Sequence, residues 1–228
     1  MIAVIPAYNE ERNIIKVLKD LNDLGIDAIV IDDGSTDNTY KVVEDFSKKA
    51  KIKIYLIKNE KNLGKAKSIK KGTELALSLG YELIIYMDGD YQHKPKDIIK
   101  LYNKLNKCNA DAVFGVRKYK KIPFHRKIMN VIASFLTSLA IMVYTKKIIF
   151  FRDIQCGFRI IKANFLKDVE FGEGYAVEHL IALQLVKKGA KIVEEYVDVD
   201  YHDEAISYIT HKKILNVIRQ IIKFVFFR

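Results

Sequence analysis

The sequence has only two cysteines, Cys108 and Cys156, among 228 residues. Two thiols cannot build a disulfide framework or a four-thiolate zinc site, so we expect a reducing compartment. The N-terminus lacks the basic start and the long apolar run of a signal peptide, which predicts a protein made and kept in the cytosol. Half of the residues are hydrophobic and 29% are charged, a globular composition that excludes disorder and collagen-like repeats.

Two common nucleotide-binding loops are also missing. No Gly-x-Gly-x-x-Gly segment follows the first apolar run, which argues against a dinucleotide site. A Walker A loop ending at Gly64-Lys65 would need glycine where Asn59 stands and serine or threonine where Ala66 stands, so a P-loop NTPase is excluded. The Gly64-Lys65 pair at a predicted helix start is still typical of a phosphate contact.

Positive charge is in excess, with 39 Lys and Arg against 28 Asp and Glu, for a net charge of +11. This balance predicts an anionic partner, which is a nucleic acid, a phosphate-bearing ligand or an anionic membrane. The length suits one large domain, or one domain with a small appendage.

Short apolar runs alternate with amphipathic stretches in the first half of the chain. Strands are predicted at residues 2–5, 28–31, 52–57, 83–87 and 112–116, with Pro6 ending the first. Helical spacing occurs between them, near residues 10–24, 37–50, 65–79 and 95–107. This alternation predicts an α/β fold with a parallel sheet covered by helices on both faces. Such sheets bind ligands where strands end and helices begin.

Pairs of acidic residues follow two of the predicted strands. Asp32 and Asp33 come directly after the second, where helix capping would account for only one carboxylate. Asp88 and Asp90 come after the fourth and, at positions i and i+2 of an extended segment, point the same way. Two like charges repel unless a cation or proton separates them. Hard oxygen ligands favour Mg²⁺ or Mn²⁺, completed by water and substrate phosphates.

The second half contains two long apolar stretches. Residues 128–145 are 18 consecutive uncharged residues, the minimum for a spanning helix. Polar side chains lie within this stretch, several of them on one helical side: Asn130, Ser134, Thr137 and Ser138. A membrane span, a buried helix and a helix in the membrane interface are the three alternatives. Residues 212–228 form a basic amphipathic stretch, which either docks on the sheet or binds anionic lipid.

Four motifs occur together at residues 6–11 (PAYNEE), 32–37 (DDGSTD), 62–72 (NLGKAKSIKKG) and 88–95 (DGDYQHKP). In this order and spacing the chain resembles the family-2 glycosyltransferases with the GT-A fold. The segment CGFR at residues 156–159 narrows the resemblance to the dolichyl-phosphate mannose synthase and polyprenyl-phosphate glycosyltransferase branch. Further residues around that segment support this branch: Asp153, Gly174, Tyr175 and Glu178.

The resemblance implies a Rossmann-like GT-A domain with a mixed, mostly parallel sheet flanked by helices over residues 1–210. An insertion of amphipathic interfacial helices would lie at about residues 122–147, and residues 211–228 would form a C-terminal basic amphipathic helix. It also implies a peripheral protein at the cytoplasmic face of the cell membrane that binds an anionic membrane surface and no nucleic acid.

The resemblance further implies roles for individual residues. The nucleotide-sugar donor would be bound by Pro6, Tyr8, Glu10, Asp33, Lys65, Asp88 and Gly89. The metal, Mg²⁺ or Mn²⁺, would be bound by Asp88, Asp90 and Gln92. Arg117 and Arg126 would bind the acceptor phosphate and, with Asp90, make up the catalytic set. Tyr208 stands where relatives carry a lysine, so the basic contacts of that loop would come from His202, His211 or Lys212.

The implied reaction is an inverting transfer from a UDP- or GDP-sugar to dolichyl or polyprenyl phosphate. Such a phosphate is already mostly ionised at neutral pH, so it needs positioning by arginine rather than a general base. The alternative is a transferase acting on a sugar or polysaccharide hydroxyl, which would need a carboxylate base such as Glu178. A non-catalytic basic peripheral protein is the third hypothesis, but it gives no reason for two aspartate pairs at strand ends.

Overall fold

The computed structural model describes residues 1–118, 124–200 and 211–227, with only the backbone described at 124–127 and 211–214. These residues form a seven-stranded sheet in the order β3-β2-β1-β4-β6-β5-β7. The strands are β1 Ile2–Ala7, β2 Asp27–Asp32, β3 Ile54–Lys58, β4 Leu83–Tyr86, β5 Ala112–Arg117, β6 Arg159–Lys162 and β7 Ile192–Val197. β6 is antiparallel to β4 and β5, and the other pairs are parallel. The predicted mixed, mostly parallel sheet is therefore confirmed.

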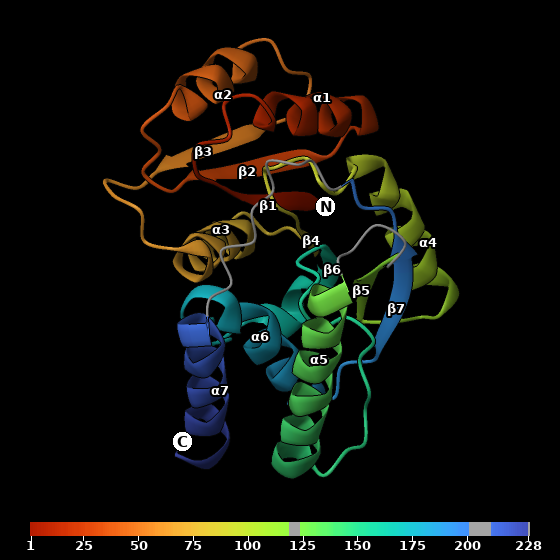
Figure 1. Ribbon diagram of the computed structural model, residues 1–228. Helices are drawn as coiled ribbons and strands as arrows, with labels where there is room; N and C mark the ends of the chain where they lie inside the picture. The colour runs from red at the N-terminus through yellow and green to blue at the C-terminus, as the bar shows by residue number, and fades with distance from the viewer. Residues whose placement is uncertain (119–123, 201–210, 228) are drawn as a thin grey trace.

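Helices cover both faces of the sheet, as predicted (Figure 1). They are α1 Ile14–Leu24, α2 Thr39–Ser47, α3 Lys65–Ser78, α4 Ile98–Lys107 and α6 Val177–Lys187. Alternate residues of β1 enter two separate cores: Ala3 and Ile5 pack with α1, α2 and α4, whereas Ile2 and Val4 pack with α3 and α6. Because β1, β2, β3 and β4 are parallel, their carboxyl ends lie at one edge of the sheet. Asp33 follows β2 and Asp88 follows β4 at this edge.

β1 runs through Pro6 to Ala7, so the prediction that Pro6 ends this strand was wrong. β2 pairs with β1 along its whole length, but β4 pairs only with Ile2, Ala3 and Val4. Pro6 thus lies beyond the residues of β1 that pair with β4. The missing amide hydrogen of Pro6 therefore removes no hydrogen bond between β1 and β4.

Helix α5, Phe124–Thr145, has its polar side turned toward the domain. Ser134 Oγ accepts a hydrogen bond from the backbone of Ile154, and Ser138 Oγ accepts one from the backbone of Phe151. The opposite side exposes large apolar residues: Ile128, Met129, Val131, Ile132, Phe135, Leu136, Leu139, Met142 and Val143. Ile128–Thr145 is long and apolar enough to cross a membrane, by length and composition only, and 28% of it is buried. The apolar side is therefore not packed into the core formed by the described residues.

Helix α7, His211–Phe226, runs beside α5, and both project from the sheet (Figure 1). The rings of Tyr144 and Phe224 meet edge to face, with centroids 5.5 Å apart. The side-chain amide of Gln220 bonds to both backbone groups of Glu173, at 2.8 and 3.2 Å. α7 is thus docked through one side. The other side exposes apolar and basic residues: Leu215, Arg219, Ile222, Lys223 and Phe226.

Candidate active site

A cluster of carboxylates lies where β1 and β4 end. Burial, together with the charges of Asp88 and Glu10, raises the pKa of Asp90 to about 7. Burial also raises the pKa of Glu10, and the charge of Asp88 adds to the rise. Asp90 Oδ1 accepts a hydrogen bond of 2.9 Å from the backbone of Gln92. The site therefore concentrates negative charge that a cation would stabilise.

The cluster fits a divalent cation that is bound together with a substrate. No group of three or more His, Cys, Asp or Glu side chains is arranged as a metal site within the described residues. Mg²⁺, however, is commonly bound by one or two protein carboxylates, with waters and substrate phosphates completing its shell. Asp88 and Asp90 supply such a pair, since burial and the nearby charge of Asp88 raise the pKa of Asp90. The role of the Gln92 side chain stays a prediction.

Lys65 joins this cluster from the first turn of α3. Its Nζ lies 2.7 Å from Asp88 Oδ1, 3.0 Å from Asp88 Oδ2 and 3.0 Å from Glu178 Oε1. Burial opposes ionisation of the amine, but the two carboxylates outweigh it and raise the pKa of Lys65. Burial likewise opposes ionisation of Asp88, but Lys65 outweighs it and lowers the pKa of this carboxyl. Lys65 and Asp88 therefore form an ion pair on which Glu178 converges.

Gly157 lies directly against this ion cluster. A Cβ atom at this position would lie 2.9 Å from Lys65 Nζ, 3.4 Å from Asp88 Oδ2 and 3.7 Å from Glu178 Oε1. A side chain at residue 157 would therefore require the ammonium of Lys65 to move from its present position.

On the β2 side, Asp33 ties two loops together. Its carboxylate accepts hydrogen bonds from the backbones of Leu63 and Gly64, at 2.9 and 2.8 Å, and from Asn59 Nδ2 at 2.7 Å. Gly34 has φ +74°, and a Cβ there would lie 2.5 Å from the carbonyl carbon of Lys61. Both loops are therefore fixed in close contact at the edge where the predicted donor site lies.

The predicted nucleoside contacts stay predictions, although they share this edge. Pro6 lies in β1, and Tyr8 follows it with 44% of its surface exposed. Asp33 already accepts three hydrogen bonds, and a carboxylate has about four acceptor positions. Gly89 is closely packed, since a Cβ there would lie 3.2 Å from that of Ala7.

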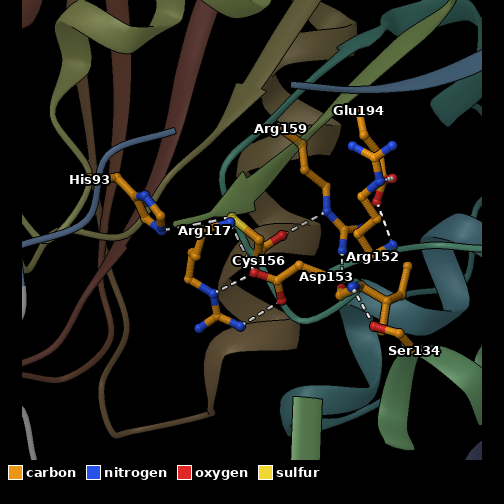
Figure 2. Close-up of polar contacts among 9 residues, drawn as sticks. His93, Arg117, Ser134, Arg152, Asp153, Cys156, Arg159 and Glu194 are labelled. Atoms are coloured by element: carbon orange, nitrogen blue, oxygen red, sulfur yellow. Dashed lines mark hydrogen bonds and ion pairs between the residues drawn. The ribbon is translucent and has the colours of Figure 1, made fainter. Parts of the chain in front are cut away.

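Arg117 lies at the end of β5, where its guanidinium faces Asp153 (Figure 2). Its Nε and Nη2 each donate a 2.7 Å hydrogen bond to a different oxygen of Asp153. His93 lies nearby, with Nε2 3.8 Å from Cys156 Sγ. Burial lowers the pKa of His93 to about 4 and raises that of Cys156 to about 12, so both groups are neutral at pH 7.

Arg159 is buried beside Asp153 and Cys156 (Figure 2), and it joins the segment between Asp153 and Gly157 to α6. Its Nε donates to Cys156 O at 3.0 Å, its Nη1 donates to Glu178 O at 2.8 Å, and its Nη2 donates to Ile154 O. Its guanidinium also lies 4.0 Å from the centroid of the Phe114 ring. The sequence signalled this segment through the CGFR motif and Asp153, but the positioning roles of Asp153, Gly157 and Arg159 were missed.

Several predicted residues lie outside the described part of the chain. The side chain of Arg126 is one of them, although its backbone belongs to α5. The same holds for the side chains of His211 and Lys212, and for all of His202 and Tyr208. The structure therefore does not test the acceptor contact of Arg126 or the basic contacts expected after β7.

Comparisons with known proteins agree with this architecture. The family model described as "Glycosyl transferase family 2" matches residues 2–167. An uncharacterized protein of Methanocaldococcus jannaschii is 71% identical over 227 residues, covering 99% of each chain. The UDP-N-acetylglucosamine–dolichyl-phosphate N-acetylglucosaminyltransferase of Methanococcus voltae is 33% identical over 72% of this chain and 70% of its own length. The dolichol-phosphate mannosyltransferase of Pyrococcus furiosus is 27% identical over 84% of this chain, which spans 54% of that relative.

Solved structures share the fold. Glucosyl-3-phosphoglycerate synthase of Mycobacterium tuberculosis, in complex with Mn²⁺ and UDP-glucose, superposes with a TM-score of 0.70 at 19% identity, over 97% of this chain and 76% of its own. At this identity the likeness shows the fold alone, and that fold is GT-A. With the family model matching most of the chain, the protein belongs to glycosyl transferase family 2 and is a glycosyltransferase.

Proposed function

We propose that this enzyme transfers a sugar from a UDP- or GDP-sugar to dolichyl or polyprenyl phosphate, with inversion, at the cytoplasmic face of the membrane. The observation that carries the proposal is the position of Arg117, whose charge acts on Asp88 of the carboxylate cluster and whose chain neighbour Val116 lines an apolar cavity. Asp153 holds its guanidinium, and Ile154, the next residue, donates its amide to Ser134 of α5. An anionic head and an apolar tail would meet matching surfaces here.

The apolar surface begins next to Arg117. A cavity of about 390 Å³ lies between β5, β7 and α5. Its lining is mostly apolar and includes Val116, Val131, Phe135, Phe150 and Tyr196. The exposed apolar side of α5 continues from it. This arrangement supports a lipid acceptor more than a water-soluble one, because an isoprenoid chain would cover surface that is otherwise exposed to water.

The donor side uses the carboxylate cluster. Asp88 and Asp90, with Gln92, would hold Mg²⁺ or Mn²⁺ together with the donor's diphosphate. Such a metal supplies positive charge that stabilises the leaving nucleoside diphosphate. Lys65 contributes a further positive charge at the same point. Two crystal structures of one structural neighbour, glucosyl-3-phosphoglycerate synthase, contain Mn²⁺ with UDP or UDP-glucose and are consistent with this use of the cluster.

The acceptor needs no base under this proposal. A phosphate monoester has a second pKa near 6 and is mostly a dianion at pH 7. Arginine orients such an oxygen anion through paired hydrogen bonds. Glu178, the base required for a hydroxyl acceptor, is paired with Lys65 at 3.0 Å and has only 7% of its side chain exposed. This pairing favours the phosphate acceptor over the hydroxyl.

The exposed sides of α5 and α7 support attachment to the membrane. Both helices expose apolar residues, and α7 adds Arg219 and Lys223 on its exposed side. Apolar side chains flanked by basic residues suit an interfacial helix on anionic lipid. Two of the relatives have names that include dolichyl phosphate or dolichol phosphate, which also supports a lipid acceptor.

The test is a panel of radiolabelled UDP- and GDP-sugars, each incubated with polyprenyl phosphate, Mg²⁺ and the purified full chain. We expect label to enter the organic phase with one donor, only when polyprenyl phosphate is present. Asp90→Asn serves as the inactive control enzyme. It removes one charge and little volume from the proposed metal site, so it should abolish transfer. Transfer of label to a sugar acceptor but never to polyprenyl phosphate would overturn the proposal.

A further inference from the structure

We infer that Lys65 balances Asp88 and Glu178 before the donor binds, and that its ammonium passes from Asp88 to the donor's diphosphate when metal and donor enter. Lys65 would then act as an exchangeable internal cation that couples metal binding to nucleotide binding. The inference rests on the proposed metal-dependent use of a nucleotide-sugar.

The contacts of Asp88 show why an exchange is required. Lys65 Nζ lies within 3.0 Å of both Asp88 oxygens. A carboxylate whose two oxygens both accept from an ammonium has fewer lone pairs, and less net negative charge, to offer a divalent cation. Metal binding at Asp88 therefore competes with the existing ion pair.

Glu178 helps to hold the ammonium of Lys65 in its position. It approaches the cluster from α6, and its carboxylate is almost fully buried. Arg159, a buried arginine, donates three hydrogen bonds to backbone oxygens, including that of Glu178, and none of the three reaches the Glu178 carboxylate. Among the described residues, the ion pair of this carboxylate is with Lys65. Glu178 is thus a positioning residue that keeps the ammonium beside the site.

The chain around Lys65 lets the ammonium move while the backbone stays fixed. Gly64 donates its amide to Asp33, which anchors the start of α3. The lysine stem has four methylene groups and rotatable donors, so a side-chain rotation is enough to redirect Nζ. Gly157 places no side chain in the way, since even a Cβ there would lie 2.9 Å from Nζ.

A definite coupling follows from this geometry. Without a nucleotide, a cation at Asp88 must displace Lys65 and leave the ammonium without its main partner. With a nucleoside diphosphate present, the displaced ammonium gains a new anion, so metal binds more tightly. Because coupling between two ligands is reciprocal, the metal strengthens nucleotide binding by the same factor.

The experiment measures Mn²⁺ binding to the full chain by the electron paramagnetic resonance signal of free Mn²⁺, alone and with UDP or GDP. Lys65→Met removes the charge, and Lys65→Gln removes it while keeping a hydrogen-bonding group. Lys67→Met is the matched control, because it removes an equal charge from an exposed position of the same helix. All variants are checked for folding by circular dichroism.

We expect wild type to bind Mn²⁺ at least tenfold more tightly with one of the two nucleotides. Lys65→Met and Lys65→Gln should bind Mn²⁺ alone about tenfold more tightly than wild type and should lose most of the gain from nucleotide. Lys67→Met should match wild type. The difference should persist at high salt, since the partly buried contact between Lys65 and Asp88 is screened less than a contact between exposed charges.

Two results would count against these ideas, and they can be told apart. If wild type binds Mn²⁺ with nucleotide but both Lys65 variants bind it like wild type in every condition, the exchange is wrong and the proposed function stands. If wild type binds no Mn²⁺ even with UDP or GDP, the metal-dependent function fails and the exchange fails with it.

Discussion

Asp153 accepts one hydrogen bond on each carboxylate oxygen from the guanidinium of Arg117, and both are 2.7 Å long. The same carboxylate accepts the backbone amide of Arg117 at 3.1 Å, and its side chain is fully buried. The plane of the guanidinium at the end of β5 is therefore set by the protein.

Asp153→Asn should weaken acceptor binding selectively. The amide keeps the shape of the side chain but presents a donor to a guanidinium that also donates, so Arg117 loses its fixed orientation. We expect the KM for polyprenyl phosphate to rise about tenfold, which corresponds to a loss of about 1.4 kcal/mol of binding free energy. The KM for the sugar nucleotide should stay unchanged. Asp198→Asn, at an exposed carboxylate after β7, is the control. An equal rise in both KM values would place Arg117 at the donor instead.

Asp90→Asn should stabilise the metal-free protein above pH 7. Burial and the charges of Asp88 and Glu10 raise the pKa of Asp90 to about 7 in the folded state, against an ordinary value of 3.8 for an aspartate. Below both values the carboxyl is protonated in both states and has no effect. As pH rises toward 7 the folded state increasingly disfavours the charge, so wild type loses stability that the asparagine variant keeps. The free energy of unfolding of the variant should exceed that of wild type by at least about 1.4 kcal/mol, which corresponds to a pKa shift of one unit.

This gain is measured by urea unfolding between pH 4.5 and 8 with EDTA present. Asp111→Asn is a control that should change stability in the opposite direction. Burial alone would raise the pKa of Asp111, but its hydrogen bonds to Lys191 and Lys162 outweigh burial and lower the pKa. Asp111 contributes stability above pH 4, so its variant should be less stable than wild type at pH 7. An Asp90 variant whose advantage does not change with pH would contradict the assigned environment.

Arg159→Leu should destabilise the fold by about 3–5 kcal/mol, because three backbone carbonyls lose their donor. The measurement is the free energy of unfolding in urea. Arg152→Leu is the matched control, since Arg152 is an exposed arginine of the same segment that pairs with Glu194, and its loss should cost less than about 1 kcal/mol. A cost below 1 kcal/mol for Arg159 would mean that the segment is held by other contacts.

The triple variant Ile132→Gln, Phe135→Gln and Leu139→Gln should no longer bind anionic lipid vesicles. These side chains are exposed on α5, so thermal stability should change little. Vesicle co-sedimentation measures the effect, and Leu79→Gln with Ile99→Gln, at exposed apolar positions elsewhere, is the control. If the triple variant still sediments fully, the exposed side of α7 is the stronger attachment.

The apolar runs of the buried parallel strands made most of the sheet predictable. β1, β2, β4 and β5 each lie within two residues of the predicted bounds, because strands covered on both faces are almost continuously apolar. β6 was missed because its four residues include Arg159 and Lys162, and a buried arginine is compatible with a strand only where other segments supply acceptors. β7, at the sheet edge, carries Glu194 and Glu195 and gives a weaker apolar signal.

The site was predictable only where its chemistry lies close together in the sequence. Asp88 and Asp90 are two residues apart, so the chain keeps them close to each other, although Gly89 and Asp90 lie in a turn and the expected extended segment was wrong. The contact between Lys65 and Glu178 joins residues 113 positions apart, and it depends on the strand order that brings α3 and α6 together. No local pattern encodes that order.

The reversed polarity of α5 changes which substitutions the helix tolerates. In most helices of a globular domain, a serine-to-leucine change on the surface is mild and a phenylalanine-to-glutamine change is damaging. In α5, leucine at Ser134 or Thr137 would remove buried hydrogen bonds, whereas glutamine at Phe135 would replace an apolar group that is exposed to solvent. A more soluble form of the enzyme is therefore obtained by altering the side of α5 that hydropathy alone would assign to the core.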